Sequence, residues 1–474
     1  MDPCLLTARE MAGALRRREI SARELVTAHL ERIEEVDGDV NAVVTRVPER
    51  ALAAADAADA RLAAGEAVGP LHGLPVAHKD THLTAGIRTT FGSPLLADHV
   101  PDADELVIER MRGAGAITVG KTNVPEFAAG SHTFNPVFGT TANPYDLTRS
   151  AGGSSGGAAA ALTCGMHPLA DGSDMGGSLR NPASFCNVVG LRPSPGRVPT
   201  YPSTAPWATL AVQGPMARTV ADAALLLSVL AGPDPRSPIA LAAPGSTFGV
   251  RLDRDLRGLR VAWAPDLGGA VTVDPAVTAA LAPQAAVFEE LGCVVEPACP
   301  DLRGADEVFR TWRAWLFALS MGPTLDAHPG RLKPALAANI ADGRRLSGDD
   351  LARAEVARTA LFHRMREFFT RYDVLLAPVS QVPPFEATLE HPATIDGVPH
   401  PHYLDWMASA YLISATGHPA LSVPAAFTPD GLPVGLQIVG PAHGDLLVLQ
   451  VGHAFEAATG AGRRRPTGRR SRRA

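Results

Sequence analysis

Three lysines stand out in a chain that otherwise carries its positive charge on arginine. Of the 43 basic residues only Lys79, Lys121 and Lys333 are lysines, and the remaining 40 are arginines. A guanidinium keeps its proton at any usable pH, whereas a buried lysine can lose its proton and act as a base. Each lysine is therefore a candidate for proton chemistry.

Two clusters of glycine and serine could form the walls of a site. The first spans 152–157 (GGSSGG) and the second spans 171–178 (DGSDMGGS), with a predicted helix and strand between them. Glycine at this density costs conformational entropy, and it is tolerated mostly where the backbone bends sharply or approaches a ligand closely. We expect both clusters to be loops that face one site.

The first cluster could also have a function of its own. A phosphate-binding loop requires G-x-x-x-x-G-K-[ST] or G-x-G-x-x-G, and the cluster has neither the lysine nor that spacing. A nucleophile elbow, G-x-S-x-G, does match 152–156, and it would make Ser154 the nucleophile of an α/β-hydrolase-type esterase. An elbow should follow a strand, but residues 143–150 have a turn-like composition.

Together with Lys79, the two clusters resemble the signature of the amidase signature hydrolases. The likeness runs from residue 7 to about residue 458, and it is densest over 150–199. Further matching segments are GPLHGLPVAHKD, VGKTNVPEFA, FGTTANPYDLTRSAGG, GPMARTVADAALLL and GLPVGLQIVGP. A dispersed pattern of this length is not expected by chance, and it implies an amidase with that family's α/β fold.

The resemblance implies catalytic roles for three residues. Ser178 matches the family's nucleophile, Ser154 matches its bridging serine after a cis peptide bond, and Lys79 matches its general base. Ser178 lies 24 positions after Ser154, and Ser154 lies 75 positions after Lys79, as in the family. These spacings imply a Ser-cisSer-Lys triad.

The resemblance also implies the surroundings of the triad. Ala128 falls where the family lines the acyl site with backbone, and Ser154 also borders the substrate. The peptide nitrogens that match the oxyanion hole are those of Met175, Gly176, Gly177 and Ser178. Supporting positions are Gly153, Ser155, Ser173, Asp174 and Arg180.

The chemistry of these residue types agrees with the assignment. A serine hydroxyl is a weak nucleophile until a base removes its proton, and Lys79 can be that base only when neutral. The apolar segment 74–77 before Lys79 predicts burial, which lowers the pKa of a lysine. Ser178 is expected near a helix N-terminus, where free N–H groups favour a developing oxyanion.

Two histidines flank the lysine and raise the possibility of a metal pair. Side chains of neighbouring strand residues point to opposite faces, so His78 and His82 are not expected to converge. No third ligand is evident in the sequence. We therefore expect no metal and no cofactor.

The elements around these residues alternate between helix and strand. Capping boxes, Thr7 with Glu10 and Ser21 with Glu24, and an alanine-rich stretch at 48–64 predict N-terminal helices. The further predicted helices lie at 105–113, after 155, at 220–231, 275–291 and 349–371. The predicted strands end near 79 and lie at 116–119, 166–170, 260–264 and 374–377. This order predicts an α/β fold, with one large domain and a mostly buried mixed sheet flanked by helices.

Three segments follow from this pattern. Residues 1–65 are expected to form a helical segment packed on the core, and 66–461 the amidase signature core. The last segment, 462–474, carries seven arginines, and like charges at this density predict a flexible, solvated tail. No tandem repeat or long linker divides the chain.

Composition excludes several classes of protein. The 474 residues are 46% hydrophobic and 19% charged, which is typical of a soluble globular chain. The net charge of −6 disfavours a nucleic-acid partner. The uncharged stretch 406–427 is broken by one glycine and two prolines, so no membrane span is expected.

Charged residues within the first ten positions argue against a signal peptide and favour a cytoplasmic location. The five cysteines are scattered along the chain, and they predict neither disulfides nor a zinc site.

The sequence therefore predicts an amidase that forms an acyl-enzyme at Ser178, as a monomer or homodimer. Segments 201–210, 309–334 and 381–406 are rich in Trp, Phe, Leu and Pro, and they favour an apolar or aryl amide, with carbamates and esters as further candidates. The alternative within the family is the glutaminase subunit of a tRNA-dependent amidotransferase. The segment before VLLAPVS lacks the arginine- and tyrosine-rich sequence expected of that branch.

Overall fold

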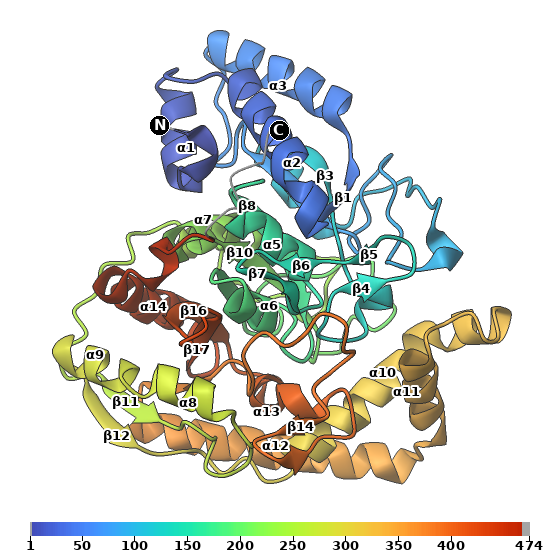
Figure 1. The fold of residues 1–474 in the computed structure, drawn as a ribbon, viewed down its shortest axis with the longest axis vertical. Helices are drawn as coiled ribbons and strands as arrows, with labels where there is room; N and C mark the ends of the chain where they lie inside the picture. The colour runs from blue at the N-terminus through green and yellow to red at the C-terminus, as the bar shows by residue number, and fades with distance from the viewer. Residues whose placement is uncertain (1, 467–474) are drawn as a thin grey trace.

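An eight-stranded mixed sheet runs through the computed structural model, which describes residues 2–466 (Figure 1). The strand order is β12-β11-β13-β17-β16-β9-β10-β8. Strands β12, β11 and β13 pair in parallel, and every other neighbouring pair is antiparallel. The bounds are β8 Leu169–Asp174, β9 Val189–Arg192, β10 Val212–Ala217, β11 Arg260–Trp263, β12 Val294–Pro297, β13 Val374–Pro378, β16 Ala420–Phe427 and β17 Pro433–Val439. The predicted α/β class with a mixed sheet is confirmed.

A three-stranded sheet lies beside the β8 edge. Strand β3 (Ile117–Thr122) pairs antiparallel with β1 (Val43–Arg46) and parallel with β2 (Pro75–Lys79). The backbone N–H of Lys79 donates to Asp171 Oδ1 of β8 at 2.9 Å, so a side chain links the two sheets here. The predicted helical segment 1–65 therefore also contributes a strand, β1, to the sheet that carries the lysine.

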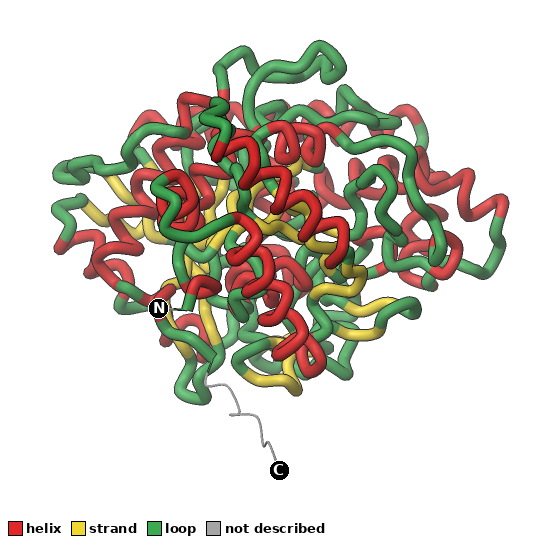
Figure 2. Tube along the Cα trace, turned by 90° about the horizontal axis from the view of Figure 1, so that it is seen from above, coloured by secondary structure: helices red, strands yellow, loops and turns green. Residues whose placement is uncertain are grey.

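Helices cover both faces of the main sheet, and Figure 2 shows them around the strands. Because strand residues alternate between faces, Val374 and Leu376 join one apolar cluster and Leu375 and Ala377 join the other. The first cluster includes residues of α1 (Ala8–Arg16), α2 (Ala22–Val40), α5 (Gly156–Thr163), α7 (Val220–Leu230) and α14 (Asp445–Thr459). The second includes residues of α10 (Ala305–Ala327), α12 (Gly348–Arg371) and α13 (Ala408–Thr416).

Elements with a local sequence signal are confirmed. Thr7 and Ser21 cap α1 and α2 with both hydrogen bonds of a capping box. Helices α3 (Pro48–Ala63) and α4 (Leu106–Gly113), together with α7, α12, β11 and β13, match their predicted ranges to within one residue. These signals depend on residues close in sequence, which explains why they could be recognised.

The helix predicted over 275–291 is wrong in one respect. The structure has two helices there, α8 (Pro275–Leu281) and α9 (Gln284–Glu290). Pro283 lies between them, and a proline has no N–H to continue a helical hydrogen-bond ladder. The proline separates two helices where the apolar pattern suggested one.

Two predicted boundaries near the glycine clusters are also wrong. Strand β8 extends to Asp174 instead of ending at 170, because 169–174 pair with 212–217 of β10. Residues 146–150, predicted to be a turn, form strand β7 (Asp146–Ser150) against β6 (Ala142–Asn143). A strand therefore does precede Ser154, although it belongs to a separate two-stranded ribbon.

The predicted arginine-rich tail, 462–474, lies mostly outside the described residues, which end at 466. Its described start is packed: Tyr145 Oη donates to the Arg464 carbonyl at 2.7 Å, and the Arg464 guanidinium lies 4.0 Å from the centre of the Phe427 ring. Across 2–466, no helix combines the length and apolar character needed to cross a membrane.

Helices α10 and α11 (Pro334–Arg345) pack closely at Gly343, and replacing this glycine tests the packing. A Cβ at position 343 would lie 2.0 Å from the Ala314 carbonyl oxygen of α10. Gly343→Ala should therefore lower the free energy of unfolding by about 1–3 kcal/mol, measured by chemical denaturation. The matched control is Gly38→Ala in α2, where nothing lies within 4 Å and the exchange should stabilise by about 0.5–1 kcal/mol. Equal effects at both positions would contradict the packing.

Candidate active site

Lys79 ends strand β2 with its side chain fully buried among three serine hydroxyls. Its Nζ lies 2.8 Å from Ser154 Oγ, 2.9 Å from Ser155 Oγ and 2.9 Å from Ser173 Oγ. Burial lowers the pKa of Lys79 from its usual 10.5 to about 7, although nearby carboxylates act in the opposite direction. The structure thus brings three of the predicted serines together around the amine of the predicted lysine, and this amine is easily neutralised.

The alternation of strand β8 explains how this cluster is assembled. Asp171 and Ser173 are two residues apart, so their side chains share the face that meets Lys79. Asp174 is on the opposite face, where it meets arginines. One strand therefore serves two parts of the site.

No pattern in the sequence pointed to Asp171. Its carboxylate brings His78 and His82 together, so the prediction that the two rings do not converge is wrong. Its Oδ2 lies 2.5 Å from His78 Nδ1 and its Oδ1 lies 2.8 Å from His82 Nδ1. The rings converge because the chain turns after β2, where the His82 N–H donates to the Lys79 carbonyl at 2.9 Å. Burial alone would raise the pKa of Asp171, but the histidines hold it well below its usual value. No group of three or more possible metal ligands occurs in residues 2–466.

The turn that carries Ser154 is held by a neighbouring loop. The Gly153–Ser154 peptide bond is cis. Ser131 Oγ donates to the Gly153 carbonyl at 2.6 Å, and Thr133 Oγ1 donates to the Gly152 carbonyl at 2.8 Å. A Cβ at 153 would lie 3.0 Å from the backbone of this loop, so a larger residue would push the loop away by a few tenths of an ångström. Ser131 and Thr133 had no recognisable pattern in the sequence, because their partners lie about twenty positions away.

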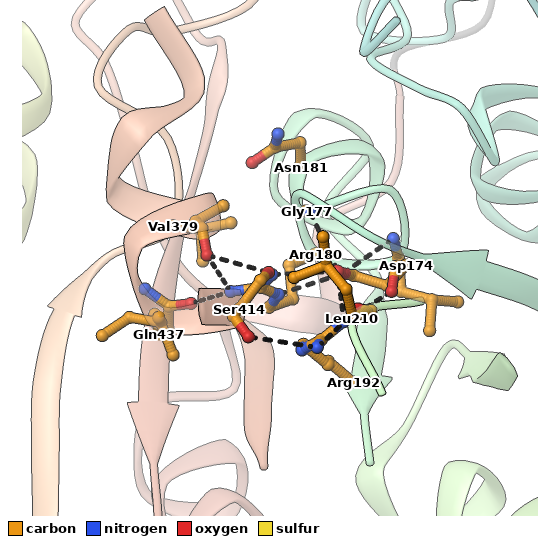
Figure 3. A network of polar contacts seen from close by, with 12 residues as sticks. Asp174, Gly177, Arg180, Asn181, Arg192, Leu210, Val379, Ser414 and Gln437 are labelled. Carbon is orange, nitrogen blue, oxygen red and sulfur yellow. Dashed lines mark hydrogen bonds and ion pairs between the residues drawn. The ribbon is translucent and has the colours of Figure 1, made fainter. Parts of the chain in front are cut away.

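A buried ion-pair network fixes the loop before Ser178 (Figure 3). Arg180 donates from Nε and Nη2 to the two carboxylate oxygens of Asp174, at 3.0 and 2.9 Å. Its remaining donors contact the Ala410 carbonyl, Gln437 Oε1 and Ser414 Oγ at 2.8, 2.6 and 2.6 Å. All five N–H groups of this buried guanidinium are therefore paired.

Asp174 is also paired with Arg192, whose Nη1 lies 3.2 Å from Oδ1. Burial alone would raise the pKa of Asp174, but Arg180 and Arg192 hold that pKa well below its usual value. The carboxylate stays ionised and accepts from the N–H groups of Gly177 and Leu179 at 2.9 and 3.2 Å. The ion pair thus fixes the backbone between β8 and α6 (Arg180–Phe185).

This network changes the predicted set of oxyanion donors. Because Asp174 accepts the Gly177 N–H, that group is not available to a substrate oxygen. Met175, Gly176 and Ser178 line the cavity described below, whereas Gly177 does not. Gly177 instead supplies the loop with a φ of +113°, a conformation that other residues rarely adopt.

A cavity of about 330 Å³ opens above the serines. Ser154, Ser173 and Ser178 line it together with Ala128, which has a φ of +56° after Phe127 at +50°. Two consecutive left-handed residues without glycine are a strained arrangement that accumulates at functional sites. Among the described residues, no hydrogen bond joins Ser178 Oγ to Ser154 Oγ, and Ser178 is 8% exposed.

Most of the remaining cavity wall is apolar. Two of the three segments rich in Trp, Phe, Leu and Pro contribute to it: 309–334 through α10 and 381–406 through Leu404. Segment 201–210 lines an adjoining cavity that shares Ser173 and Met175. The apolar lining residues are Phe91, Phe127, Met175, Phe309, Phe317, Met321, Leu404 and Met407. The polar side chains of the wall that were not predicted as site residues are those of Thr81, His82, Glu105, Gln213, Arg313 and Ser320.

Comparison with known proteins identifies the family. A family model described as Amidase matches residues 24–449. An acylamidase of Rhodococcus erythropolis is 36% identical over 95% of each chain, and a glutamyl-tRNA(Gln) amidotransferase subunit of Moorella thermoacetica is 38% identical over 98% of this chain and 99% of its own. A bacterial aryl acylamidase of the amidase signature family superposes with a TM-score of 0.89, at 32% identity over 96% of each chain. The chain belongs to the amidase signature family and is an amide-hydrolysing enzyme.

Replacing Arg180 tests whether the ion-pair network fixes the site. Arg180→Lys keeps the charge but cannot supply five donors, so it leaves buried acceptors unpaired. We expect the free energy of unfolding to fall by about 3 kcal/mol, measured by chemical denaturation. The control, Arg353→Lys at an exposed helix position, should change it by less than about 0.5 kcal/mol. An Arg180→Lys protein as stable as the wild type would contradict the role of the network.

Proposed function

We propose that this enzyme hydrolyses the C–N bond of a small apolar or aryl amide through an acyl-enzyme on Ser178. The observation that carries the proposal is a buried lysine, with a pKa near 7, in contact with Ser154 below a cavity that Ser178 also lines. A base is effective when its pKa lies near the working pH. Ser154 is then both a bridge for the proton and a wall of the substrate site.

The proposed reaction moves one proton along this chain of groups. As Ser178 Oγ bonds to the amide carbon, its proton passes to Ser154 and the Ser154 proton passes to neutral Lys79. The N–H groups of Met175, Gly176 and Ser178 receive the oxyanion. Lys79 and Ser154 return the proton to the leaving amine as the C–N bond breaks. Water then repeats the sequence on the acyl-enzyme and releases the acid.

The nature of the cavity supports the substrate class. Four phenylalanines and three methionines line its wall, and they favour contact with an apolar or aromatic group. Carbamates and esters with the same substituents fit the same chemistry. In this proposal the enzyme acts as a monomer or homodimer, without a cofactor.

A second candidate is the glutaminase subunit of a tRNA-dependent amidotransferase. It is favoured by the 38% identity to an amidotransferase subunit over 98% of this chain. Purified chain tested alone against anilides, primary amides, carbamates, esters and L-glutamine separates the two functions. Hydrolysis of anilides by the chain alone supports the small-molecule amidase, whereas activity limited to glutamine and dependent on partner subunits supports the amidotransferase.

Active-site labelling should identify Ser178 as the nucleophile. A fluorophosphonate should attach to Ser178, mapped by mass spectrometry, and Ser178→Ala should take up no label. Ser154→Ala should lose most turnover, because the proton relay is cut, yet the label should still be found at Ser178. A label mapped to Ser154 would instead support the elbow esterase.

The pH dependence should follow the deprotonated fraction of Lys79. With a pKa of about 7, kcat/KM should rise roughly tenfold from pH 6 to pH 8 and then level off. Lys79→Arg should be as inactive as Lys79→Ala at every pH, because a guanidinium does not release its proton.

The control for the lysine exchange is Lys333→Arg. The Lys333 Nζ donates to the Ala129 carbonyl, which a guanidinium can also do, so this variant should keep activity within about threefold of the wild type. Activity of Lys79→Arg within tenfold of the wild type, or a wild-type profile flat down to pH 5, would exclude a lysine base.

A further inference from the structure

Arg313 is a buried arginine in the wall of the catalytic cavity, and it forms no ion pair with a carboxylate. Its exposed fraction is 5%, and none of the ion pairs formed within residues 2–466 involves it. Its Nη1 is completely buried and has no hydrogen-bond partner. Arg180, buried to a similar degree, uses all five donors. An unpaired buried guanidinium is costly, which indicates that its partner is a ligand.

The surroundings of Arg313 are aromatic. Its guanidinium lies 4.5 Å from the centre of the Phe317 ring and 5.4 Å from that of Tyr403. Ring faces attract a cation, but they do not accept its in-plane hydrogen bonds. The nearby Arg310 is already paired with Asp306 and Asp405, each at 2.8 Å. Burial lowers the pKa of Arg313, the Tyr403 hydroxyl raises it, and Arg310 lowers it. The carboxylates of Asp306 and Asp405 are occupied by Arg310, and the Glu105 carboxylate in the same cavity accepts from Gln213 and the Leu83 N–H, so none of the three is paired with Arg313.

Helix α10 aims this charge at the substrate. Phe309, Arg313 and Phe317 recur every four residues, so they form one stripe along α10, which lies beside α13 and α11 in Figure 1. All three residues line the cavity that Ser178 lines. A substrate whose carbonyl is bound at Ser178 therefore shares one enclosed space with the guanidinium.

We propose that Arg313 binds a carboxylate of the substrate, so that the preferred amides are apolar or aryl amides with a carboxylate away from the scissile bond. This inference rests on the proposed function and defines its substrate class. A planar guanidinium offers a carboxylate two parallel hydrogen bonds and gains strength from desolvation. An ammonium group at the same place is disfavoured by the charge of Arg313.

Matched substrate pairs test the preference. On the acyl side, glutaryl 4-nitroanilide is compared with valeryl 4-nitroanilide. On the amine side, 4-acetamidobenzoate is compared with 4-methylacetanilide. The wild type should prefer the charged member of at least one pair by tenfold or more in kcat/KM, and the pair concerned identifies which part of the substrate meets Arg313.

Variants of Arg313 then identify the residue responsible. Arg313→Met should reduce the preference at least tenfold, mainly through KM, and Arg313→Lys should retain part of it. The control, Arg345→Met at a position 72% exposed, should leave the preference intact. Equal rates for both members of each pair in the wild type, or a preference that survives Arg313→Met, would overturn the inference.

A binding measurement keeps this test independent of catalysis. In the Ser178→Ala background, calorimetric titration with 4-acetamidobenzoate should give a Kd at least tenfold lower than in the Ser178→Ala, Arg313→Met double variant. The same exchange should weaken 4-methylacetanilide by less than threefold. Equal Kd values for the carboxylate would overturn the role of Arg313. Absence of hydrolysis and of Ser178 labelling, with carboxylate binding intact, would instead contradict the proposed function alone.

Discussion

Strand β8 ends at Asp174, and helix α6 begins six positions later at Arg180. The buried ion pair between these two side chains fixes the conformation of the loop that joins the strand to the helix. Two ions removed from water are tolerated only when nearly every polar atom is paired, as the Arg180 donors are. Met175, Gly176 and Ser178 lie in the loop between these two residues, so the backbone that carries their amides has little freedom. The orientation of the candidate nucleophile and oxyanion donors thus depends on an interaction that touches no substrate.

Strand β8 connects this loop to the lysine. Its pleat directs Asp174 toward the arginines and Asp171 and Ser173 toward Lys79. Both aspartates raise the pKa of Lys79, but Asp174 is paired with Arg180 and Arg192, and the burial of the amine outweighs both carboxylates. Desolvation therefore dominates the pKa of Lys79, and the amine can be neutral near pH 7.

The cavity above the serines combines apolar walls with one unsatisfied charge. Phe309 and Phe317 on α10 shape the space, and Arg313 between them has no protein partner for Nη1. The same helix packs closely on α11 at Gly343, so the wall that selects substrate is part of the hydrophobic framework. In the proposed mechanism, chemistry and specificity are thus carried by different elements: Lys79 and Ser173 lie at the edge of the sheet, and helix α10 contributes Phe309, Arg313 and Phe317 to the cavity wall.

Features that depend on neighbours along the chain could be predicted from the sequence. Capping boxes indicated the starts of α1 and α2, and apolar runs indicated β11 and β13. The scarcity of lysine and the two Gly-Ser clusters marked candidate segments, and the resemblance to the amidase signature hydrolases then implied roles for Lys79, Ser154 and Ser178. These signals are local or compositional, so they can be recognised without knowledge of the fold. Even there, Pro283 separated two helices where periodicity suggested one.

The long-range partners became visible only in the folded chain. The convergence of His78 and His82 on Asp171, the use of the Gly177 N–H by Asp174 and the clamp of Ser131 and Thr133 on the Ser154 turn all join groups from separate segments. Arg313 looked like any other arginine among 40, because its missing partner is visible only once its surroundings are known. A hydrogen bond or a desolvation cost depends on distance in space, and spacing along the chain does not specify that distance.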